Sequence, residues 1–412
     1  MDIVELRHLG SEPRWLALWA ATAGYVLDAM DVLLYLFALQ TIRAEFGLTA
    51  AQAGLVSSFT LLTSAAGGVM AGIVSDKVGR RRTLVYTILF YSLASAGSAT
   101  ARNLNELLFW RSLVGLGMGG EWSAGAVLVA ETWSAEHRAK AIGFMQSGWA
   151  AGYMLAAGVS ALILPRYGWR VLFLVGVLPA FLCSFIRRKV MEPEVWVNRQ
   201  EVAPLSSLVK PPLLRITLPA TAVATSVLLA YWGLFTWLPG FLSAPREQGG
   251  AGFSIVRTSG WILAMQAGAF LGYLSFGFLA DRYGRRPVFV AYMLAASLLT
   301  PIYGTSPFWA GSDASAVMLI LGPLVGFFGS GYFSLFGVML AELFPTAVRG
   351  AGQGSTYNVG RSFGAAAPYA VGALADQFGF GTALALNSAF FFAAAAMIFV
   401  LPETRGRDLQ RL

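Results

Sequence analysis

Long apolar stretches recur along the whole chain, and each is long enough to cross a lipid bilayer. A hydrocarbon core about 30 Å thick needs roughly 20 apolar residues in a helix. Of the 412 residues 57% are hydrophobic and only 12% are charged, which is typical of an integral membrane protein. We therefore expect an all-α membrane protein with twelve transmembrane helices. The predicted spans are residues 15–39, 51–75, 82–100, 105–130, 140–164, 168–187, 215–243, 256–280, 287–304, 314–340, 350–374 and 379–401.

The distribution of basic residues predicts the orientation of these helices. Charges of both signs precede the first apolar run and no cleavage site follows it, so we expect a retained helix and not a signal peptide. When the loops are assigned alternately to the two sides of the membrane, most of the 29 Lys and Arg residues lie on the same side as the N-terminus. We expect a multi-pass protein of the cell (inner) membrane with both termini cytoplasmic. The basic loops suit an anionic lipid surface, and nothing in them indicates a nucleic-acid partner.

Several kinds of chemistry have no residues to support them. The single cysteine, Cys183, cannot form an internal disulfide, and the two histidines, His8 and His137, lie in predicted loops. The segment "GLGMGG" (115–120) matches a dinucleotide-binding pattern, but it lies inside an apolar helix instead of after a strand. Because no nucleophile, metal or phosphate-binding constellation is evident, we expect neither a cofactor nor an enzyme.

The chain repeats itself after about 210 residues. "GIVSDKVGRRR" (72–82) returns as "GFLADRYGRRP" (277–287), and "ETWSAEHRA" (131–139) returns as "AELFPTAVRG" (341–350). We therefore expect two six-helix bundles built on one plan. The predicted boundaries are 1–187 for the first bundle, 188–214 for a cytoplasmic linker and 215–412 for the second bundle.

These repeated motifs resemble those of the major facilitator superfamily, over essentially the whole chain. Its signature is Gly-x-x-x-Asp-(Arg/Lys)-x-Gly-Arg-(Arg/Lys), which occurs here after the second and the eighth predicted helices. The resemblance implies alternating access, in which two halves rock about a site near the membrane midplane. Within the superfamily, "DAMD" (28–31) and the segment 111–141 resemble bacterial carboxylate and proton symporters of the sialate and lactate type. Aromatic-acid symporters look similar, but they usually have Asp-Gly-Phe-Asp where this chain has "DAMD".

Acids and arginines at the predicted cytoplasmic helix ends form a candidate gate. Carboxylate and guanidinium pairs there could close the inner side and then separate, although the same charges could simply fix the topology. Gly79 and Gly284 permit tight turns within these motifs. The candidate gate residues are Asp76, Arg80, Glu131, Arg138, Asp281, Arg285, Glu342 and Arg349.

Ionisable residues inside the predicted spans are the strongest functional candidates, because charge is unfavourable there. Asp28 and Asp31 lie on nearly the same face of the first helix, Arg111 and Glu121 lie in the fourth, and Arg361 lies in the eleventh. Two structural ion pairs are one interpretation: Asp31 with Arg111, and Arg361 with Glu121 or Asp28. Three acids and two bases still leave one acid unpaired. Since burial disfavours its charged form, that acid suits a proton carrier.

Arg361 is also the first candidate for substrate binding. Its planar guanidinium cannot be neutralised and can hold a carboxylate with two hydrogen bonds, and Arg111 is the next candidate. Further polar and aromatic side chains could complete the site, although each is also consistent with simple helix packing. These are Tyr25, Gln146, Gln266, Tyr357 and Asn358.

The sequence thus predicts a proton-coupled symporter of a small organic anion, most simply a monocarboxylate. Its expected partners are the anion, protons and the bilayer, and we expect it to function as a monomer. A sugar or aromatic-acid proton symporter is the alternative within the same class. A nontransporting receptor on the same fold is the alternative from another class, and we would expect it to carry a long signalling tail.

Overall fold

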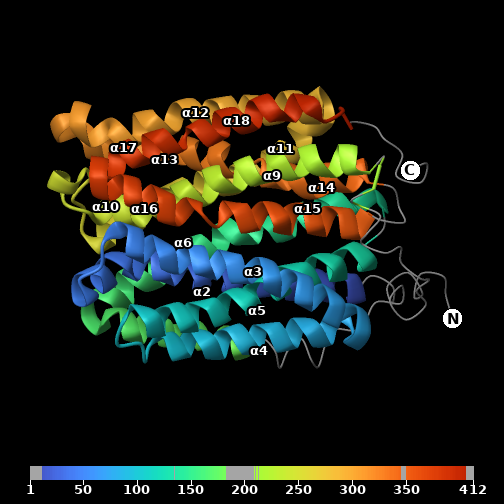
Figure 1. Ribbon diagram of the computed structural model, residues 1–412, viewed down its shortest axis with the longest axis horizontal. Coiled ribbons are helices and arrows are strands. Elements are labelled where there is room, and N and C mark those ends of the chain that lie inside the picture. Colours follow the sequence, from blue (N-terminus) through green and yellow to red (C-terminus); the bar gives the residue numbers. More distant parts are fainter. Residues whose placement is uncertain are drawn as a thin grey trace.

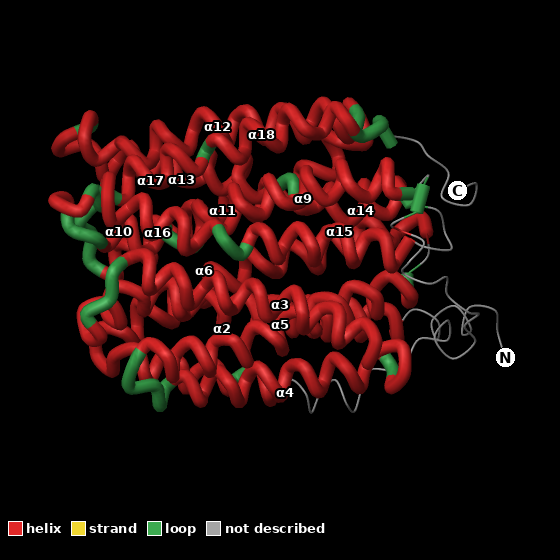
Figure 2. The backbone as a smooth tube through the Cα atoms, viewed as in Figure 1, coloured by secondary structure: helices red, strands yellow, loops and turns green. Residues whose placement is uncertain are grey.

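The computed structural model describes residues 12–133, 135–181, 208, 210–211, 213–344 and 349–404. Within these residues the regular structure is entirely helical. The helices run side by side along the long axis of the molecule, and the loops gather at its two ends (Figures 1 and 2). Eight segments of the described chain are long and apolar enough to cross a membrane. The expectation of an all-α membrane protein is confirmed.

Among the residues that the structure describes, the first half contains five long helices. They are α2 (Glu12–Phe46), α3 (Ala50–Val78), α4 (Arg80–Ser98), α5 (Leu104–Thr132) and α6 (Ala135–Leu174), followed by the short η1 (Val175–Val177). The range of α6 includes the predicted span 140–164 and the first part of the next one, 168–187, because the chain reverses at Gly168 (φ 74°, ψ 178°) without a long loop.

The second half contains more breaks than the sequence predicts. Its elements are α9 (Leu214–Phe235), α10 (Leu238–Ser243), η3 (Arg246–Gln248), α11 (Ile255–Tyr283), α12 (Arg285–Trp309), η4 (Gly311–Asp313), α13 (Ala314–Ser330), α14 (Phe333–Leu343), α15 (Arg349–Gly364), α16 (Ala367–Phe378), α17 (Phe380–Asn387), α18 (Ala389–Met397) and η6 (Ile398–Val400). Four spans predicted as continuous are therefore interrupted. Pro239 and Pro368 explain two of these breaks, since each lies in the first turn of the new helix and has no N–H to donate.

Eleven of the twelve predicted spans coincide with described helices, with these interruptions, whereas residues 182–187 of the sixth span lie outside the described residues. Most of the predicted linker, 188–214, lies outside the described residues, so the domain boundaries remain a prediction. Helices of the two halves nevertheless contact each other directly. The α6 helix packs along α11, and α3 packs along both α15 and α16.

Two pairs of glycines repeat the same backbone geometry in the two halves. Gly79 (φ 113°, ψ 156°) and Gly284 (φ 103°, ψ 155°) precede α4 and α12, as the repeated motif predicts. Gly168 (φ 74°) and Gly379 (φ 80°) form a second pair that sequence analysis missed. A residue with a Cβ atom is strained at such positive φ values, whereas glycine is not. The equivalent turns are consistent with two halves built on one plan.

The helices α3 and α5 approach each other so closely that only glycine fits between them. A Cβ atom at Gly67 would lie 2.0 Å from the Leu116 carbonyl oxygen, and one at Gly119 would lie 1.8 Å from the Ser64 carbonyl oxygen. Small residues at such crossings let helices gain packing contacts in a membrane, where lipid is as apolar as the side chains. The glycines of 115–120 are therefore packing residues in this structure, and not a nucleotide-binding loop.

The substitution Gly119→Ala should destabilise the protein, because its methyl group would overlap the α3 backbone. Overpacking of this kind costs about 1–3 kcal/mol. Thermal unfolding in detergent should show a lower Tm for Gly119→Ala than for the parent protein. Gly158→Ala is the matched control, since nothing lies within 4 Å of a Cβ at that position in α6. Equal Tm values for the two variants would contradict the predicted backbone contact.

Candidate functional site

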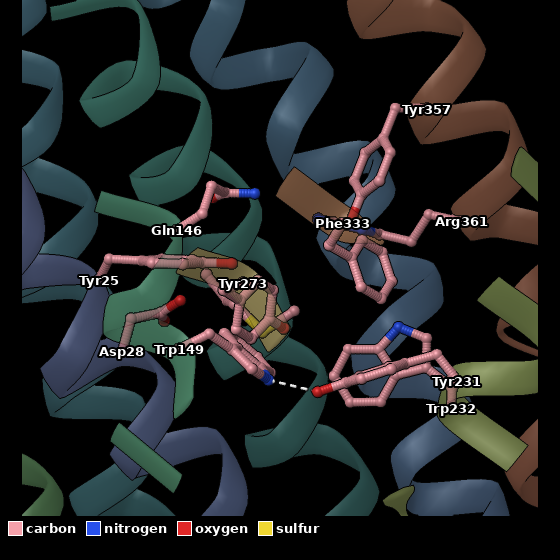
Figure 3. Close-up of a pocket in the computed structure, with 11 residues that line it drawn as sticks. Tyr25, Asp28, Gln146, Trp149, Tyr231, Trp232, Tyr273, Phe333, Tyr357 and Arg361 are labelled. Atoms are coloured by element: carbon pink, nitrogen blue, oxygen red, sulfur yellow. Dashed lines mark hydrogen bonds between the residues drawn. The ribbon is translucent and has the colours of Figure 1, made fainter. Parts of the chain in front are cut away.

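A cavity lies between the two halves, at about the middle of the helices. The space between its walls measures about 500 Å³ when the open space at its mouth is included. Helices α2, α5 and α6 contribute from the first half, and α9, α11, α14 and α15 contribute from the second. The lining residues are Tyr25, Asp28, Met118, Gln146, Trp149, Tyr231, Trp232, Tyr273, Phe333, Tyr357 and Arg361 (Figure 3).

Five residues predicted from the sequence line this cavity: Tyr25, Asp28, Gln146, Tyr357 and Arg361. Asp28 and Arg361 come from different halves, and Figure 3 places them on opposite sides of the cavity. Their relative exposures are only 1% and 6%. A carboxylate and a guanidinium are thus both held at a small-molecule cavity in the interior of a membrane protein, where charge is costly.

Arg361 is oriented by neighbours from both halves. Its Nη1 donates to Ser64 Oγ of α3 at 3.3 Å. Its guanidinium carbon lies 4.9 Å from the ring centroid of Tyr357, one helical turn earlier in α15. Cation–π contact of this kind favours a fixed position of the cation over the ring.

Asp28 has no hydrogen-bond partner at either carboxylate oxygen within the described part of the chain. The carboxylate of Glu121 likewise has none. Glu121 does not line the cavity: its Oε1 lies against α2, only 2.5 Å from where a Cβ of Gly24 would be, one turn before Asp28. Two buried acids without partners therefore lie close together, an arrangement in which ionising both is unfavourable.

Asp31 points away from the cavity. Its carboxylate accepts a hydrogen bond from Ser95 Oγ of α4 and packs against Gly176. The reason is geometric, since three residues advance an α-helix by about 300° and leave Asp28 and Asp31 some 60° apart. That difference is enough to give the two acids different neighbours, so sequence spacing overstated how alike their surroundings are.

Arg111 also lies outside the cavity, and the ion pair with Asp31 that was one interpretation of the sequence is not among those that the described residues form. Its Nη2 donates to the Val32 carbonyl at 3.1 Å, and its guanidinium lies over the rings of Tyr35 and Phe173. Arg111 therefore joins α5 to α2 from behind the site. The interpretation of Arg111 as a substrate contact finds no support in this arrangement.

Gln266 and Asn358 are buried without lining the cavity. Asn358 donates from Nδ2 to the Gly354 carbonyl at 3.0 Å and packs against α3 at Gly68. Helix packing, the alternative weighed for both residues, describes their surroundings better than substrate binding.

Aromatic side chains form most of the cavity wall, and sequence analysis missed most of them. Trp149 Nε1 donates to the Tyr231 hydroxyl at 2.6 Å and so links the two halves (dashed line in Figure 3). Ring centroids of Tyr25 and Trp149 are 5.5 Å apart, and those of Trp149 and Trp232 are 5.8 Å apart. In an apolar helix, an aromatic residue that faces a cavity has the same sequence signal as one that faces lipid. The residues missed are Met118, Trp149, Tyr231, Trp232, Tyr273 and Phe333.

The structure describes two of the eight predicted gate side chains. Arg285 Nη2 lies 3.3 Å from Glu342 Oε1, within the second half. Glu342 Oε2 also accepts from Thr404 Oγ1 at 2.5 Å. The other six side chains lie outside the described set, so the gate remains a prediction. They are Asp76, Arg80, Glu131, Arg138, Asp281 and Arg349.

Known proteins resemble this chain along its whole length. The Major Facilitator Superfamily profile matches residues 21–275 and 250–411. A probable 4-methylmuconolactone transporter of Cupriavidus pinatubonensis is 36% identical, and the match covers 98% of this chain and 94% of that protein. The cis,cis-muconate transport protein of Acinetobacter baylyi is 28% identical, over 98% of each chain.

Solved structures share the fold. The crystal structure of a D-xylose-proton symporter matches with a TM-score of 0.78, over 96% of this chain and 99% of that one, at 20% sequence identity. Together with the family profile and the relative above 30% identity, this likeness identifies the class of protein. The chain belongs to the major facilitator superfamily, and it is a multi-pass secondary transporter of small organic metabolites and not an enzyme.

Proposed function

We propose that the protein imports a small organic anion together with a proton, by alternating access of the cavity to the two sides of the membrane. The observation that carries this proposal is the placement of Asp28 and Arg361 on opposite walls of one cavity between the halves. A single chain supplies both walls, which supports function as a monomer. We place it in the inner membrane with both termini cytoplasmic, from its loop charges.

Arg361 is the proposed anchor for the anion. Its guanidinium fork matches a carboxylate in shape as well as in charge. Seven of the eleven lining residues are aromatic, and stacked or edge-on rings favour a flat ligand. The muconate relative transports an unsaturated acid by its name, which supports the same class here. We therefore favour a flat carboxylate, aromatic or unsaturated, over a sugar.

Asp28 is the proposed proton carrier. A bound carboxylate would neutralise Arg361, and a bound proton would neutralise Asp28. With only one of these ligands present, a net charge would remain in a cavity of low polarity, which is unfavourable. This difference can couple the two movements, since the halves would exchange conformations most easily when both ligands or neither is bound. Glu121 of α5, whose carboxylate lies beside Gly24 one turn before Asp28, is the second candidate for the proton site.

Replacing Arg361 should weaken binding of the acid more than it alters folding. Hydrogen bonds to charged groups contribute about 1.5–3 kcal/mol, so Arg361→Gln should raise the Kd of a carboxylate about tenfold to a hundredfold. Arg361→Lys keeps the charge but loses the fork, and should give an intermediate Kd. Quenching of cavity tryptophans on titration with the acid measures both values.

The matched control for the arginine series is Arg102→Gln, which removes an exposed arginine distant from the cavity. Its Kd should equal that of the parent. Wild-type affinity in both Arg361 variants would show that the anion is bound elsewhere.

Replacing Asp28 should separate substrate movement from proton movement. Asp28→Asn imitates the permanently protonated acid with almost no change of volume. In proteoliposomes it should abolish accumulation driven by an inward pH gradient while preserving exchange between two loaded compartments. Exposed Glu247→Gln is the control and should accumulate substrate normally. An Asp28→Asn protein that still concentrates substrate would move the proton site to Glu121, and uptake independent of pH would contradict proton coupling.

A competition panel should distinguish the proposed substrate class from its alternatives. An aromatic monocarboxylate should inhibit uptake of a labelled unsaturated acid more strongly than a saturated monocarboxylate of similar size, because of the ring contacts. The corresponding aromatic amide should compete poorly, since it brings no charge to Arg361. Competition by D-xylose, with none by any acid, would favour the sugar alternative.

A further inference from the structure

One end of the molecule carries an unusual helix cap, made by the opposite half of the chain. The backbone N–H groups of Ala50 and Ala51, the first residues of α3, each donate to the Asp376 carboxylate at 2.8 Å. Asp376 lies near the end of α16, in the second half. A carboxylate at a helix N-terminus is stabilised both by these hydrogen bonds and by the helix dipole.

The Asp376 cap completes a set of bonds that α3 cannot complete alone. A capping box joins Thr49 and Gln52: Gln52 N–H donates to Thr49 Oγ1 at 3.2 Å, and Thr49 N–H donates to Gln52 Oε1 at 3.0 Å. The next N–H, of Ala53, bonds to the Thr49 carbonyl at 3.1 Å. Only the N–H groups of Ala50 and Ala51 are left, and Asp376 accepts from both.

Other hydrogen bonds join the halves beside this cap. Gln40 Nε2 donates to the Gly240 carbonyl at 3.2 Å, and the Tyr369 N–H donates to Ser58 Oγ at 3.2 Å. Arg43 lies 3.9 Å from Asp376 and stacks over Phe380. The cap is thus one of several bonds at the same end of the molecule.

Glycines allow the backbones of α3 and α16 to meet at this end. A Cβ at Gly54 would lie 2.3 Å from the Pro368 carbonyl oxygen, and one at Gly372 would lie 2.6 Å from the Ala50 carbonyl oxygen. Both contacts join the first half to the second. They leave no room for substrate to pass between these two helices while the contacts persist.

The geometry points to a latch: we propose that Asp376, by capping α3, holds the outer side of the transporter closed, and that this cap breaks whenever the cavity opens outward. The inference rests on alternating access and on the orientation in the proposed function. Asp376 retains 31% side-chain exposure, so water can replace its bonds when the halves part. A latch at the surface can therefore open reversibly, whereas a fully buried one would leave groups unsatisfied.

The second half does not use the same device. The equivalent helix, α11, begins after Ser254, whose own Oγ accepts from the Arg257 N–H at 3.3 Å. No hydrogen bond from the first half to the start of α11 occurs among the described residues. This asymmetry explains why the latch is assigned to the single residue Asp376 and not to a symmetric pair.

External labelling of a cysteine in the cavity tests the latch. In a Cys183→Ser background, Met118→Cys places the only thiol on the cavity wall, and an impermeant maleimide is added to whole cells. Loss of a helix cap shifts an equilibrium by about twofold to thirtyfold, so Asp376→Ala should raise the labelling rate by that factor. Asp376→Asn keeps one acceptor oxygen and should give a smaller rise. Exposed Asp313→Ala, in η4, is the matched control and should label at the parent rate.

A second variant tests the same closure by disturbing the close packing of α3 against α16. Gly54→Ala would press a methyl group against the Pro368 carbonyl, so it should also raise external labelling. Folding is checked by elution volume and Tm in detergent. Parent labelling rates in well-folded Asp376→Ala and Gly54→Ala proteins, or an equal rise in Asp313→Ala, would overturn the proposal. Because labelling needs neither substrate nor proton, a wrong substrate class would leave this result unaffected.

Discussion

Charge inside a membrane protein has to be neutralised or balanced, and this requirement governs the electrostatics of the cavity. Asp28 and Arg361 lie on opposite walls, each nearly buried and each carried by a different half. Water cannot compensate them as it would at a surface, so the ligands that enter the cavity alter its electrostatic energy strongly. In the proposed mechanism, these two residues balance each other in the empty cavity and disfavour a cavity that holds only one of the two ligands. Arg361 is steadied by Ser64 and Tyr357, whereas Asp28 has no such partner among the described residues.

Close backbone packing occurs both within a half and between the halves. Glycines let α3 contact α5 within the first half and α16 across the interface. Helix crossings of this kind are stabilised by close van der Waals contact rather than by exclusion of water. Across the interface, hydrogen bonds at the Asp376 cap and at the cavity accompany these contacts.

Sequence analysis could predict the features that depend on local pattern. Apolar length predicted the helices, and the repeated motif predicted the turns at Gly79 and Gly284. The rarity of intramembrane charge singled out Asp28 and Arg361 correctly as cavity residues. Spacing alone placed Asp31 on nearly the same face as Asp28, but a rotation of some 60° about the helix gives the two acids different neighbours. The aromatic cavity wall, including Trp149 and Tyr231, could not be predicted from the sequence. In an apolar helix, the hydrophobic pattern is the same for a side chain that faces lipid as for one that faces a cavity.

The cap on α3 also bears on how the chain reaches its final form during synthesis. Ala50 is made early, but its acceptor on Asp376 is 326 residues further along the chain. Until α16 has been inserted into the bilayer, the first turn of α3 has only its own Thr49 and Gln52 to complete it. The start of α3 therefore reaches its final bonding only when the second half is nearly complete. The bond that joins the start of α3 to α16 thus forms late in synthesis, when only the last predicted span remains to be made.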